Sequence, residues 1–442
     1  MSRMKTCLLS LLVLGCVSAC GDDTKSANTA DSVVASDSQV SFDTTADTDG
    51  SIDTATDPDT TVEDTAADTV APDAVSILDG CGRAIRGADD PRVVVFARPY
   101  EDSAAKASTF GTGVLAADGT LTLNEETFDL GRATTGTFAF ARDGAVAAIH
   151  QEDGSVGIIR IDDGVVTPVT SYTGEALYAS GVAEDPTGNG VYILDVNWPN
   201  NGGGLFHLSL ACDGTPSDER LVIQSKNLRA MAWIDRSAGI ALVDSVDFLG
   251  GDVIGDVHRL AVSSSQVGTT LESLNAFDAD PIVTAIAVTP SSVGGNRLAL
   301  VSENSAFSGV PNRVVAVRLP DSGEPMTVAQ TLRGISDPFN MVLSPDGKTA
   351  MILSGDGGNR LIPVALDPSA DNPLVEGVPL ASPLPGDAVV IARGALTGHV
   401  IVTQVTGLRQ VAFAPDGSLV DLGLVEISQT LSGLPGALGV QP

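Results

Sequence analysis

Basic residues are scarce in this chain of 442 residues. It has 24 Lys and Arg against 56 Asp and Glu, which gives a formal net charge of −32. Proteins that bind nucleic acid need clustered Lys and Arg to neutralise phosphates. The composition therefore argues against a nucleic-acid partner.

Long apolar runs are missing as well. The run from Leu8 to Ala19 has about a dozen residues, whereas a helix that crosses a bilayer needs roughly 20. It follows Arg3 and Lys5, as in a secretion signal. Elsewhere 47 Gly and 24 Pro interrupt short apolar segments, which favours many short strands joined by turns.

Local motifs of catalysis and zinc binding are absent. No H-E-x-x-H, C-x-x-C or G-x-S-x-G occurs, so the sequence contains neither a local zinc site nor a nucleophile elbow. The four histidines fall in or beside separate predicted strands, where packing is their usual role. They are His150, His207, His258 and His399. A protein without enzymatic activity is therefore the leading interpretation, although a site assembled from distant segments would leave no local motif.

Two cysteines are available to the folded part of the chain. Cys7 and Cys16 lie in the leader and Cys20 ends it, which leaves Cys81 and Cys212. In an oxidising compartment this pair can form a disulfide, while two buried free thiols are the alternative.

The end of the leader, Val17-Ser18-Ala19-Cys20, resembles the lipobox of bacterial lipoproteins. This resemblance implies that residues 1–19 are a signal peptide and that Cys20 becomes a lipidated N-terminus. Acyl chains such as palmitate would then anchor the protein in a membrane. Gly21, in place of the Asp that is frequent at the inner membrane, favours the outer membrane, with either its periplasmic or its cell-surface face.

Residues 20–80 form a low-complexity segment. From Gly21 to Asp79 the chain has 14 Asp and one Glu against a single lysine, Lys25. Such a segment buries too little apolar surface to offset the entropy of ordering. We expect a disordered tether here, followed by a folded domain over residues 81–442.

One repeated unit organises that domain. Phe339–Leu343 and Thr349–Leu353 are apolar runs joined by a Ser-Pro-Asp-Gly turn, and a third run follows at Arg360–Leu366. These read as three antiparallel strands. Similar units recur roughly every 45 to 55 residues, the length of one four-stranded propeller blade. The first strands of the six complete units are Thr137–Ala141, Gly181–Glu184, Leu228–Ile234, Val283–Thr289, Phe339–Ser344 and Ala388–Ala392.

The two ends of the chain supply a seventh unit. Val93–Arg98, Gly111–Ala116 and Leu121–Leu123 lack a first strand, and Leu434–Val440 resembles a first strand with nothing after it. Pairing these segments closes a ring and removes unpaired sheet edges. The sequence therefore predicts an all-β, monomeric, seven-bladed β-propeller, closed by pairing of the C-terminal strand with the N-terminal blade.

The turn Ser344-Pro345-Asp346-Gly347-Lys348 resembles that of the YVTN and lactonase-like seven-bladed propellers. Ala414-Pro415-Asp416-Gly417 matches it in part. The resemblance covers residues 92–442 as architecture. It implies an alternative function, a metal-assisted lactonase-like hydrolase.

Acidic and amide side chains follow the second strand of several units, where loops of a propeller converge on one face. They are Glu152, Asp153, Asp195, Asn197, Asp244, Asp247, Asp252, Asp256, Glu303 and Asp356. Such oxygen ligands suit calcium or a cationic ligand. The alternative is that they satisfy turns at strand ends. The longest loops, Asp195–Gly204 and Asp244–Asp256, are the expected location of a site.

Three functions fit these features. The leading hypothesis is a lipid-anchored envelope scaffold that binds a protein, a glycan or a small molecule through its axial-face loops. The alternative is the metal-assisted hydrolase, and the third is a purely structural envelope module. Fold resemblance does not choose among them, since propellers host unrelated functions.

Overall fold

The computed structural model describes residues 81–83, 85–98, 109–132, 134, 136–174, 178–196, 203–249, 252–277, 282–304, 312–355, 359–427 and 436–442. All of them lie in one compact unit, residues 72–442. The predicted signal peptide, the lipidated Cys20 and the predicted tether lie outside the described residues. In the part of the chain described, no helix is long and apolar enough to cross a membrane.

The described elements are strands that form seven sheets, numbered here in chain order. Sheet 1 contains β1 (Arg92–Arg98), β2 (Thr109–Leu115), β3 (Leu121–Asp129) and β29 (Leu438–Val440). Sheet 2 contains β4 (Ala139–Ala141), β5 (Val146–His150), β6 (Val156–Asp162) and β7 (Val165–Tyr172). Sheet 3 contains β8 (Ala179–Glu184), β9 (Gly190–Asp195), β10 (Gly204–Leu210) and β11 (Pro216–Gln224). Sheet 4 contains β12 (Met231–Asp235), β13 (Ile240–Leu249), β14 (Asp252–Val262) and β15 (Gly268–Leu274).

The remaining sheets follow the same order. Sheet 5 contains β16 (Ile282–Val288), β17 (Asn296–Asn304), β18 (Arg313–Pro320) and β19 (Thr327–Arg333). Sheet 6 contains β20 (Pro338–Leu343), β21 (Thr349–Ser354), β22 (Arg360–Leu366), β23 (Leu374–Glu376) and β24 (Leu380–Ala381). Sheet 7 contains β25 (Pro385–Val390), β26 (His399–Gln404), β27 (Gly407–Phe413) and β28 (Leu419–Glu426).

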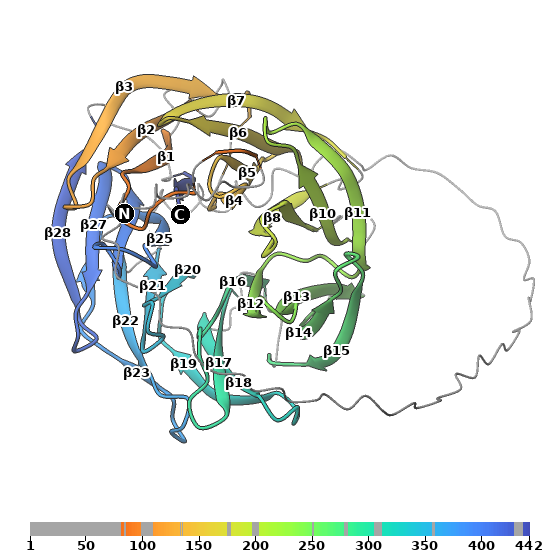
Figure 1. Ribbon diagram of the computed structural model, residues 1–442. Helices are drawn as coiled ribbons and strands as arrows, with labels where there is room; N and C mark the ends of the chain where they lie inside the picture. The colour runs from red at the N-terminus through yellow and green to blue at the C-terminus, as the bar shows by residue number, and fades with distance from the viewer. Residues whose placement is uncertain are drawn as a thin grey trace, which may run out of the picture. The chain divides into compact units, whose positions relative to one another are not determined.

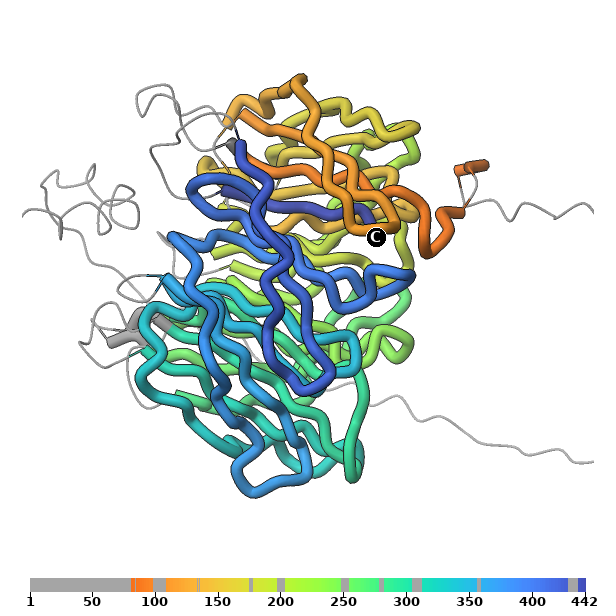
Figure 2. The backbone as a smooth tube through the Cα atoms, turned by 90° about the vertical axis from the view of Figure 1, so that its left-hand side faces the viewer, coloured from red at the N-terminus to blue at the C-terminus, as the bar shows by residue number. Residues whose placement is uncertain are grey.

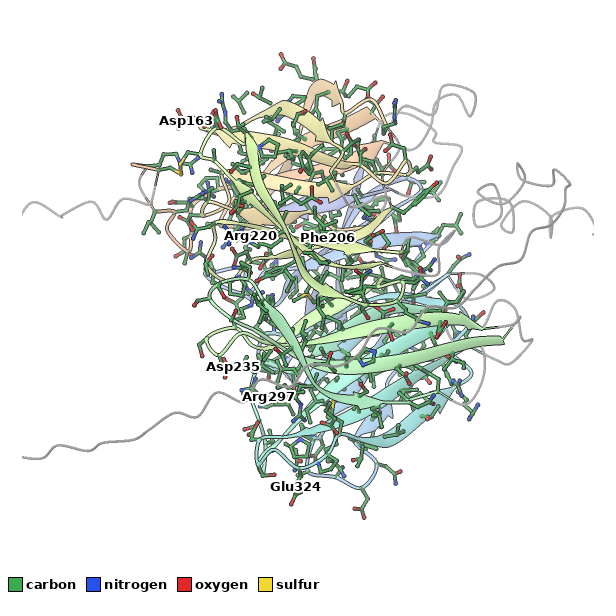
Figure 3. The ribbon with its side chains drawn as sticks, turned by 90° about the vertical axis from the view of Figure 1, so that its right-hand side faces the viewer. Asp163, Phe206, Arg220, Asp235, Arg297 and Glu324 are labelled. Carbon is green, nitrogen blue, oxygen red and sulfur yellow. A yellow bond between two sulfur atoms is a disulfide. The ribbon has the colours of Figure 1, made fainter. Side chains whose placement is uncertain are left out.

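Figure 1 shows these sheets as blades around a central axis, with β4, β8, β12, β16, β20 and β25 innermost. The predicted seven-bladed β-propeller is confirmed. Each blade is an antiparallel meander, so first-to-second and third-to-fourth turns share one end of the propeller. Figure 3 shows three such turns, near Asp163, Asp235 and Glu324, at that end, which we name the turn face. The opposite end, where inner strands begin, is named the mouth face.

The core is divided among the contacts between blades. Seven apolar clusters occur, one for each pair of neighbouring blades. Strand β5 shows why, because successive side chains point to opposite sheet faces. Ala147 and Ile149 pack toward blade 1, while Val146 and Ala148 pack toward blade 3. Middle strands therefore carry apolar residues on both faces, as the sequence indicates.

The ring closes as predicted. The last strand, β29, pairs with β1 through Val94↔Val440, Val95↔Gly439 and Phe96↔Leu438. Figure 2 shows the C-terminal residues alongside the first strands, in orange. Blade 1 is thus assembled from both ends of the chain.

The predicted loop Asp244–Asp256 is wrong. These residues belong to a long hairpin, because β13 and β14 pair from Ile240↔Ala261 out to Leu249↔Asp252. The apolar and β-branched residues between the acids favour extended backbone, and Gly250-Gly251 lies between the strands.

Pro363 lies inside the predicted strand Arg360–Leu366, where a proline predicts a bulge because it lacks an N–H group. That prediction is wrong. Pro363 pairs in regular register with Met351. On the other side of β22, the outer strand is interrupted between β23 and β24, next to Pro363. The N–H group that proline lacks is therefore not needed for a hydrogen bond between these strands.

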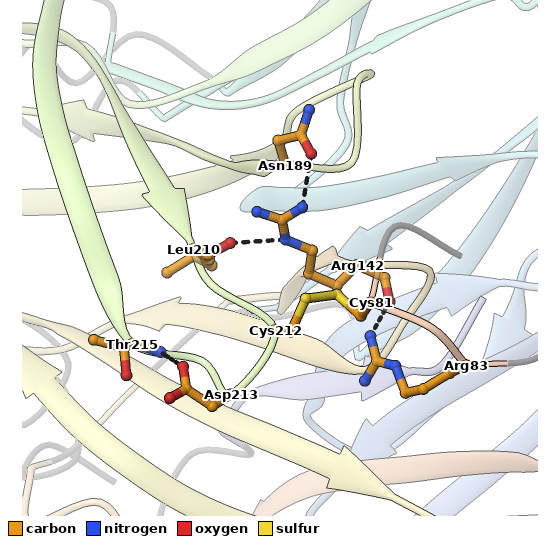
Figure 4. Close-up of a disulfide and its surroundings, with 8 residues drawn as sticks. All are labelled: Cys81, Arg83, Arg142, Asn189, Leu210, Cys212, Asp213 and Thr215. Carbon is orange, nitrogen blue, oxygen red and sulfur yellow. Dashed lines mark hydrogen bonds between the residues drawn. A yellow bond between two sulfur atoms is a disulfide. The ribbon is translucent and has the colours of Figure 1, made fainter. Parts of the chain in front are cut away.

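The segment before β1 crosses the turn face as a strap, residues 81–91. A disulfide joins Cys81 to Cys212 in the β10–β11 turn of blade 3 (Figure 4). Arg83 donates to the carbonyl oxygen of Arg142 at 3.1 Å, and the N–H of Arg86 donates to Asp143 at 3.2 Å, both in blade 2. At its far end, Asp89 accepts from the N–H of Ala395 in blade 7 at 2.7 Å. The strap therefore holds together the blades on both sides of the ring closure.

Candidate functional site at the mouth face

Polar side chains on or just after the second strands bond to the segment that enters the inner strand of the same blade. Asp195 accepts from the N–H of Tyr178 at 3.2 Å. Asp244 accepts from the N–H groups of Arg229 and Ala230 at 2.8 and 2.7 Å. Gln151, Ser302, Ser354 and Thr403 bond to backbone groups in four further blades, at Leu130, Ala285, Ser336 and Asp387. These side chains satisfy buried backbone groups, the role that the turn interpretation assigned to the acids.

The other predicted acids have separate surroundings. Asp153 pairs with Arg132 at 2.7 Å, and Asp247 pairs with Lys226 at 2.6 Å. Glu303 forms a buried ion pair with Arg313, and burial raises the pKa of Glu303 to about 7. Glu152 lies in the exposed β5–β6 turn, and Asp256 lies half-buried in β14.

The predicted acids do not form a metal site in the part of the chain that is described. No group of three or more His, Cys, Asp or Glu residues there could hold a metal ion. Asn197 and Asp356 lie outside the described residues, as does the side chain of Asp252. The predicted calcium ring is thus not assembled from the acids whose positions are described.

Replacing Asp244 by Ala should destabilise the fold most strongly at low pH. The change leaves two buried N–H groups without an acceptor, which costs about 1–3 kcal/mol each. Burial raises the pKa of Asp244 from its ordinary 3.8 to about 6, so the native state binds a proton more tightly than the unfolded state. The contribution of this carboxyl group to stability therefore falls as pH rises from about 4 through 6. Urea unfolding at pH 4.5 and pH 8 measures this difference.

Asp235→Ala is the matched control for that experiment. Asp235 also accepts two backbone N–H groups, from Ser237 at 2.9 Å and Ala238 at 3.1 Å, but at an exposed turn where water can replace it. A loss for Asp244→Ala that is no larger than the loss for Asp235→Ala, or that grows with pH, contradicts the capping role.

A second set of polar residues lies at the starts of the inner strands. Register shifts place an extra residue there in several blades, between Ala179 and Gly181, Val283 and Ala285, Pro338 and Asn340, and Pro385 and Ala388. A bulge bends the strand and redirects a side chain. In this way Ser180, Thr284 and Asp387 are turned toward neighbouring blades.

Ser180, Thr284 and Asp387, together with Asn340, link several neighbouring blades around the axis by hydrogen bonds, and we name this set of residues the axial ring. Ser180 donates to the carbonyl oxygen of Leu228, and Thr284 to that of Pro338, both at 2.7 Å. The side-chain amide of Asn340 donates to Asp387 at 2.8 Å. Asp387 also accepts from the N–H of Gly136 at 2.9 Å, across the short inner strand of blade 1.

A cavity of about 730 Å³ lies among the inner strands of blades 2, 3, 4 and 5, and the residues of the axial ring are not part of its lining. It is lined by Thr137–Ala139, Val182–Glu184, Met231–Ser237, Val288, Pro290 and Arg297. Inner strands have one unpaired edge, and unpaired edges present backbone N–H and C=O groups. The space near the axis therefore suits a polar ligand, and its volume is that of a small-molecule site.

Asp387 is the ionisable group of the axial ring. Burial raises its pKa to about 6, although the bonds from Asn340 and Gly136 oppose this shift. The imidazole of His150 packs against Gly136, where an added Cβ would lie 3.0 Å from its Cε1 atom. Burial lowers the pKa of His150 to about 4, so this ring is neutral at pH 7. A carboxyl group that titrates near neutral pH can act in acid–base chemistry.

The residues of the axial ring were not predicted from the sequence. Only the neighbouring His150 was considered there, as a packing residue. Asp387 stands directly before the predicted strand Ala388–Ala392, as an isolated charge in an apolar stretch. Ser180 stands likewise before Gly181–Glu184. A polar residue directly before a predicted inner strand was therefore the available signal for these two residues, whereas Thr284 and Asn340 lie inside predicted strands.

Fold and site together define a seven-bladed β-propeller with a polar, partly ionisable ring where its inner strands begin. No family model matches the chain, and no curated protein matches it in sequence.

Solved structures with the same fold cover about four-fifths of the chain. A proposed 6-phosphogluconolactonase from Bacteroides uniformis has a TM-score of 0.57 and 14% identity, over 79% of this chain and 99% of that one. A periplasmic gluconolactonase from Pseudomonas aeruginosa has a TM-score of 0.55 and 15% identity, over 80% and 99%. A protein from Lactobacillus plantarum has a TM-score of 0.55 and 14% identity, over 80% and 100%. At these identities the likeness establishes the fold.

Proposed function

We propose that this chain hydrolyses lactones at the axial ring. The observation that carries the proposal is the buried carboxyl group of Asp387, placed there with a pKa near 6. Above that pH its carboxylate can accept a proton from water, as a general base must. The likeness in fold to proteins described as gluconolactonases supports the same chemistry.

The proposed reaction uses Asp387 twice. Water loses a proton to the carboxylate while its oxygen forms a bond to the lactone carbonyl carbon. The bond from that carbon to the ring oxygen then breaks, and the proton on Asp387 passes to the ring oxygen. The product is the open hydroxy acid. The rest of the substrate would extend along the axis toward the cavity, whose lining includes Thr137 next to Gly136. Thr284 and Ser180 offer half-buried hydroxyl groups at the axial ring.

This form of the hydrolase differs from the metal-assisted one suggested by the family resemblance. A metal-activated water needs several ligands at one point. The described acids instead cap inner strands or form separate ion pairs. The proposal therefore gives the role of base to a protein carboxyl group.

The test is release of acid from five- and six-membered sugar lactones, followed in a pH-stat with and without a chelator. We expect turnover that a chelator leaves unchanged. Turnover abolished by the chelator would support the metal-assisted form, and absence of turnover with every lactone would refute the proposal.

Binding without turnover is the second candidate function. Its support is that the described polar groups of the axial ring and the second-strand ends already bond to protein atoms, which suits a rigid recognition surface. Saturable binding of a lactone or hydroxy acid with no acid release would favour this scaffold.

We propose an outer-membrane location through lipid on Cys20. The lipobox resemblance supports it, and the Cys81–Cys212 disulfide fits an oxidising compartment outside the cytoplasm. Recovery of the wild-type protein with the inner membrane, or unchanged membrane association of Cys20→Ala, would contradict it.

A further inference from the structure

A chain of hydrogen bonds crosses three strands of blade 4. The Oγ atom of Ser245 in β13 lies 2.6 Å from Nε2 of His258 in β14. The Nδ1 atom of the same imidazole lies 2.7 Å from Oγ of Ser273 in β15. Both nitrogens of His258 are therefore held by serine hydroxyls.

The strand register produces this arrangement. His258 and Ser273 are direct partners across β14 and β15. Ser245 is the direct partner of Asp256, which puts it diagonally opposite His258. Diagonal neighbours on one sheet face lie within reach of a long or aromatic side chain. The backbone ladder thus fixes the three side chains relative to one another.

The arrangement has the form of a nucleophile, a base and an orienting group. With the proton on Nδ1, His258 donates to Ser273, and its free Nε2 accepts the Ser245 hydroxyl hydrogen. Burial lowers the pKa of His258, opposed by Asp256, so the ring is neutral and able to accept a proton at pH 7. Ser273 is exposed and Ser245 is half-buried, so small molecules can reach the hydroxyl of Ser245.

An ion pair lies on the same face of β13 as Ser245. Asp247 follows Ser245 by two residues and therefore lies on the same face of β13. It binds the ammonium group of Lys226 at 2.6 Å. The Asp247 carboxylate neutralises this ammonium group, so the pair brings no net charge to the face that carries Ser245.

We propose that Ser245 is a nucleophilic serine that accepts acyl groups from small activated esters. His258 removes the hydroxyl proton as Oγ forms a bond to the acyl carbon. The ester C–O bond breaks and the leaving alcohol takes that proton. Water, deprotonated by His258, then attacks the acyl carbon. The bond from that carbon to Oγ of Ser245 breaks, His258 returns the proton to Oγ, and the acid is released. This site lies in β13, β14 and β15, apart from the axial ring, and is independent of the proposed lactone hydrolysis.

The experiment measures the rate at which a fluorophosphonate probe labels the full chain, with the modified peptide located by mass spectrometry. We expect a single labelled residue, Ser245, and no label in Ser245→Ala. His258→Gln should slow labelling at least about 100-fold, the contribution of a general base. Ser263→Ala is the control and should label as the wild type does, because its hydroxyl group bonds only within the next turn, to Ser265 and the N–H of Val267.

Ser273 acts as a positioning residue. Ser273→Ala should slow labelling to a rate between those of the wild type and His258→Gln, without lowering the thermal unfolding midpoint. Ser273→Thr, which keeps the hydroxyl group, should restore the wild-type labelling rate. Label that persists in Ser245→Ala, a labelling rate unaffected by His258→Gln, or no label in the wild type at millimolar probe would overturn the proposal.

Discussion

Replacing Cys81 and Cys212 together by Ser should lower the free energy of unfolding by about 2–5 kcal/mol. The disulfide closes a loop that spans 131 residues of sequence, and a cross-link over so long a loop strongly restricts the unfolded chain. It also holds the strap, whose hydrogen bonds reach blade 2 and blade 7 on the two sides of the ring closure. Denaturant unfolding of the oxidised wild type and the double variant measures the loss.

Limited trypsin digestion tests whether that loss begins at the strap. Arg83 and Arg86 are engaged in hydrogen bonds while the disulfide holds Cys81 against blade 3. Reductant should expose both arginines to cleavage in the wild type and should have no effect on the double variant. Equal unfolding free energies for the two proteins, or cleavage at Arg83 that is independent of reductant, would contradict this role of the disulfide.

Replacing Asp387 by Asn should reduce lactone turnover by about 10²–10⁴-fold, the usual contribution of a general base. The amide keeps the shape of the side chain and an oxygen that can accept the N–H of Gly136, so the fold should persist. In the wild type, kcat/KM should fall as pH drops through about 6, because the base must be unprotonated and the pKa of Asp387 is raised to about 6. The pKa of His150 is about 4, so this ring does not titrate in the same range.

Two further variants separate catalysis from structure. Asn340→Ala removes a hydrogen bond that stabilises the carboxylate, so the pKa of Asp387 and the acid limb of the pH profile should both move upward. Asp185→Asn changes another buried acid, which pairs with His207 at 3.1 Å in blade 3, and should alter stability without altering the profile. A pH profile identical in the wild type and Asn340→Ala would refute the assignment of the limb to Asp387.

The sequence was most informative about strands that are buried on both faces. Arg360–Leu366 was predicted with the bounds of β22, and the predicted run Thr349–Leu353 ends one residue before β21 does. The outer strands were not predicted, because exposed strands such as Val165–Tyr172 carry polar residues that read as loop. Closure of the ring followed from counting strands at the two ends of the chain.

The site was less predictable, because it depends on bulges. One extra residue in an inner strand turns Thr284 or Ser180 toward the next blade, and hydrophobic periodicity does not reveal which residue is extra. Asp195 and Asp244 were predicted at strand ends. Their hydrogen-bond partners, the N–H groups of Tyr178 and Ala230, precede the inner strands and are brought to these acids only by the fold. The surroundings of Asp387 come from three blades, because its partners Asn340 and Gly136 lie in blades 6 and 2, so they could not be predicted from the residues next to it in sequence.

The disulfide also determines where a mechanical load enters the propeller. A pull on the chain before Cys81 passes through the covalent bond into the β10–β11 turn of blade 3. Strand β1, held to β29 by only three residue pairs, lies beyond the strap and is spared that force. Without the bond, the same pull would reach the ring closure and peel those pairs apart one after another. A propeller suspended by its N-terminal end can therefore stay closed under drag from the surrounding fluid.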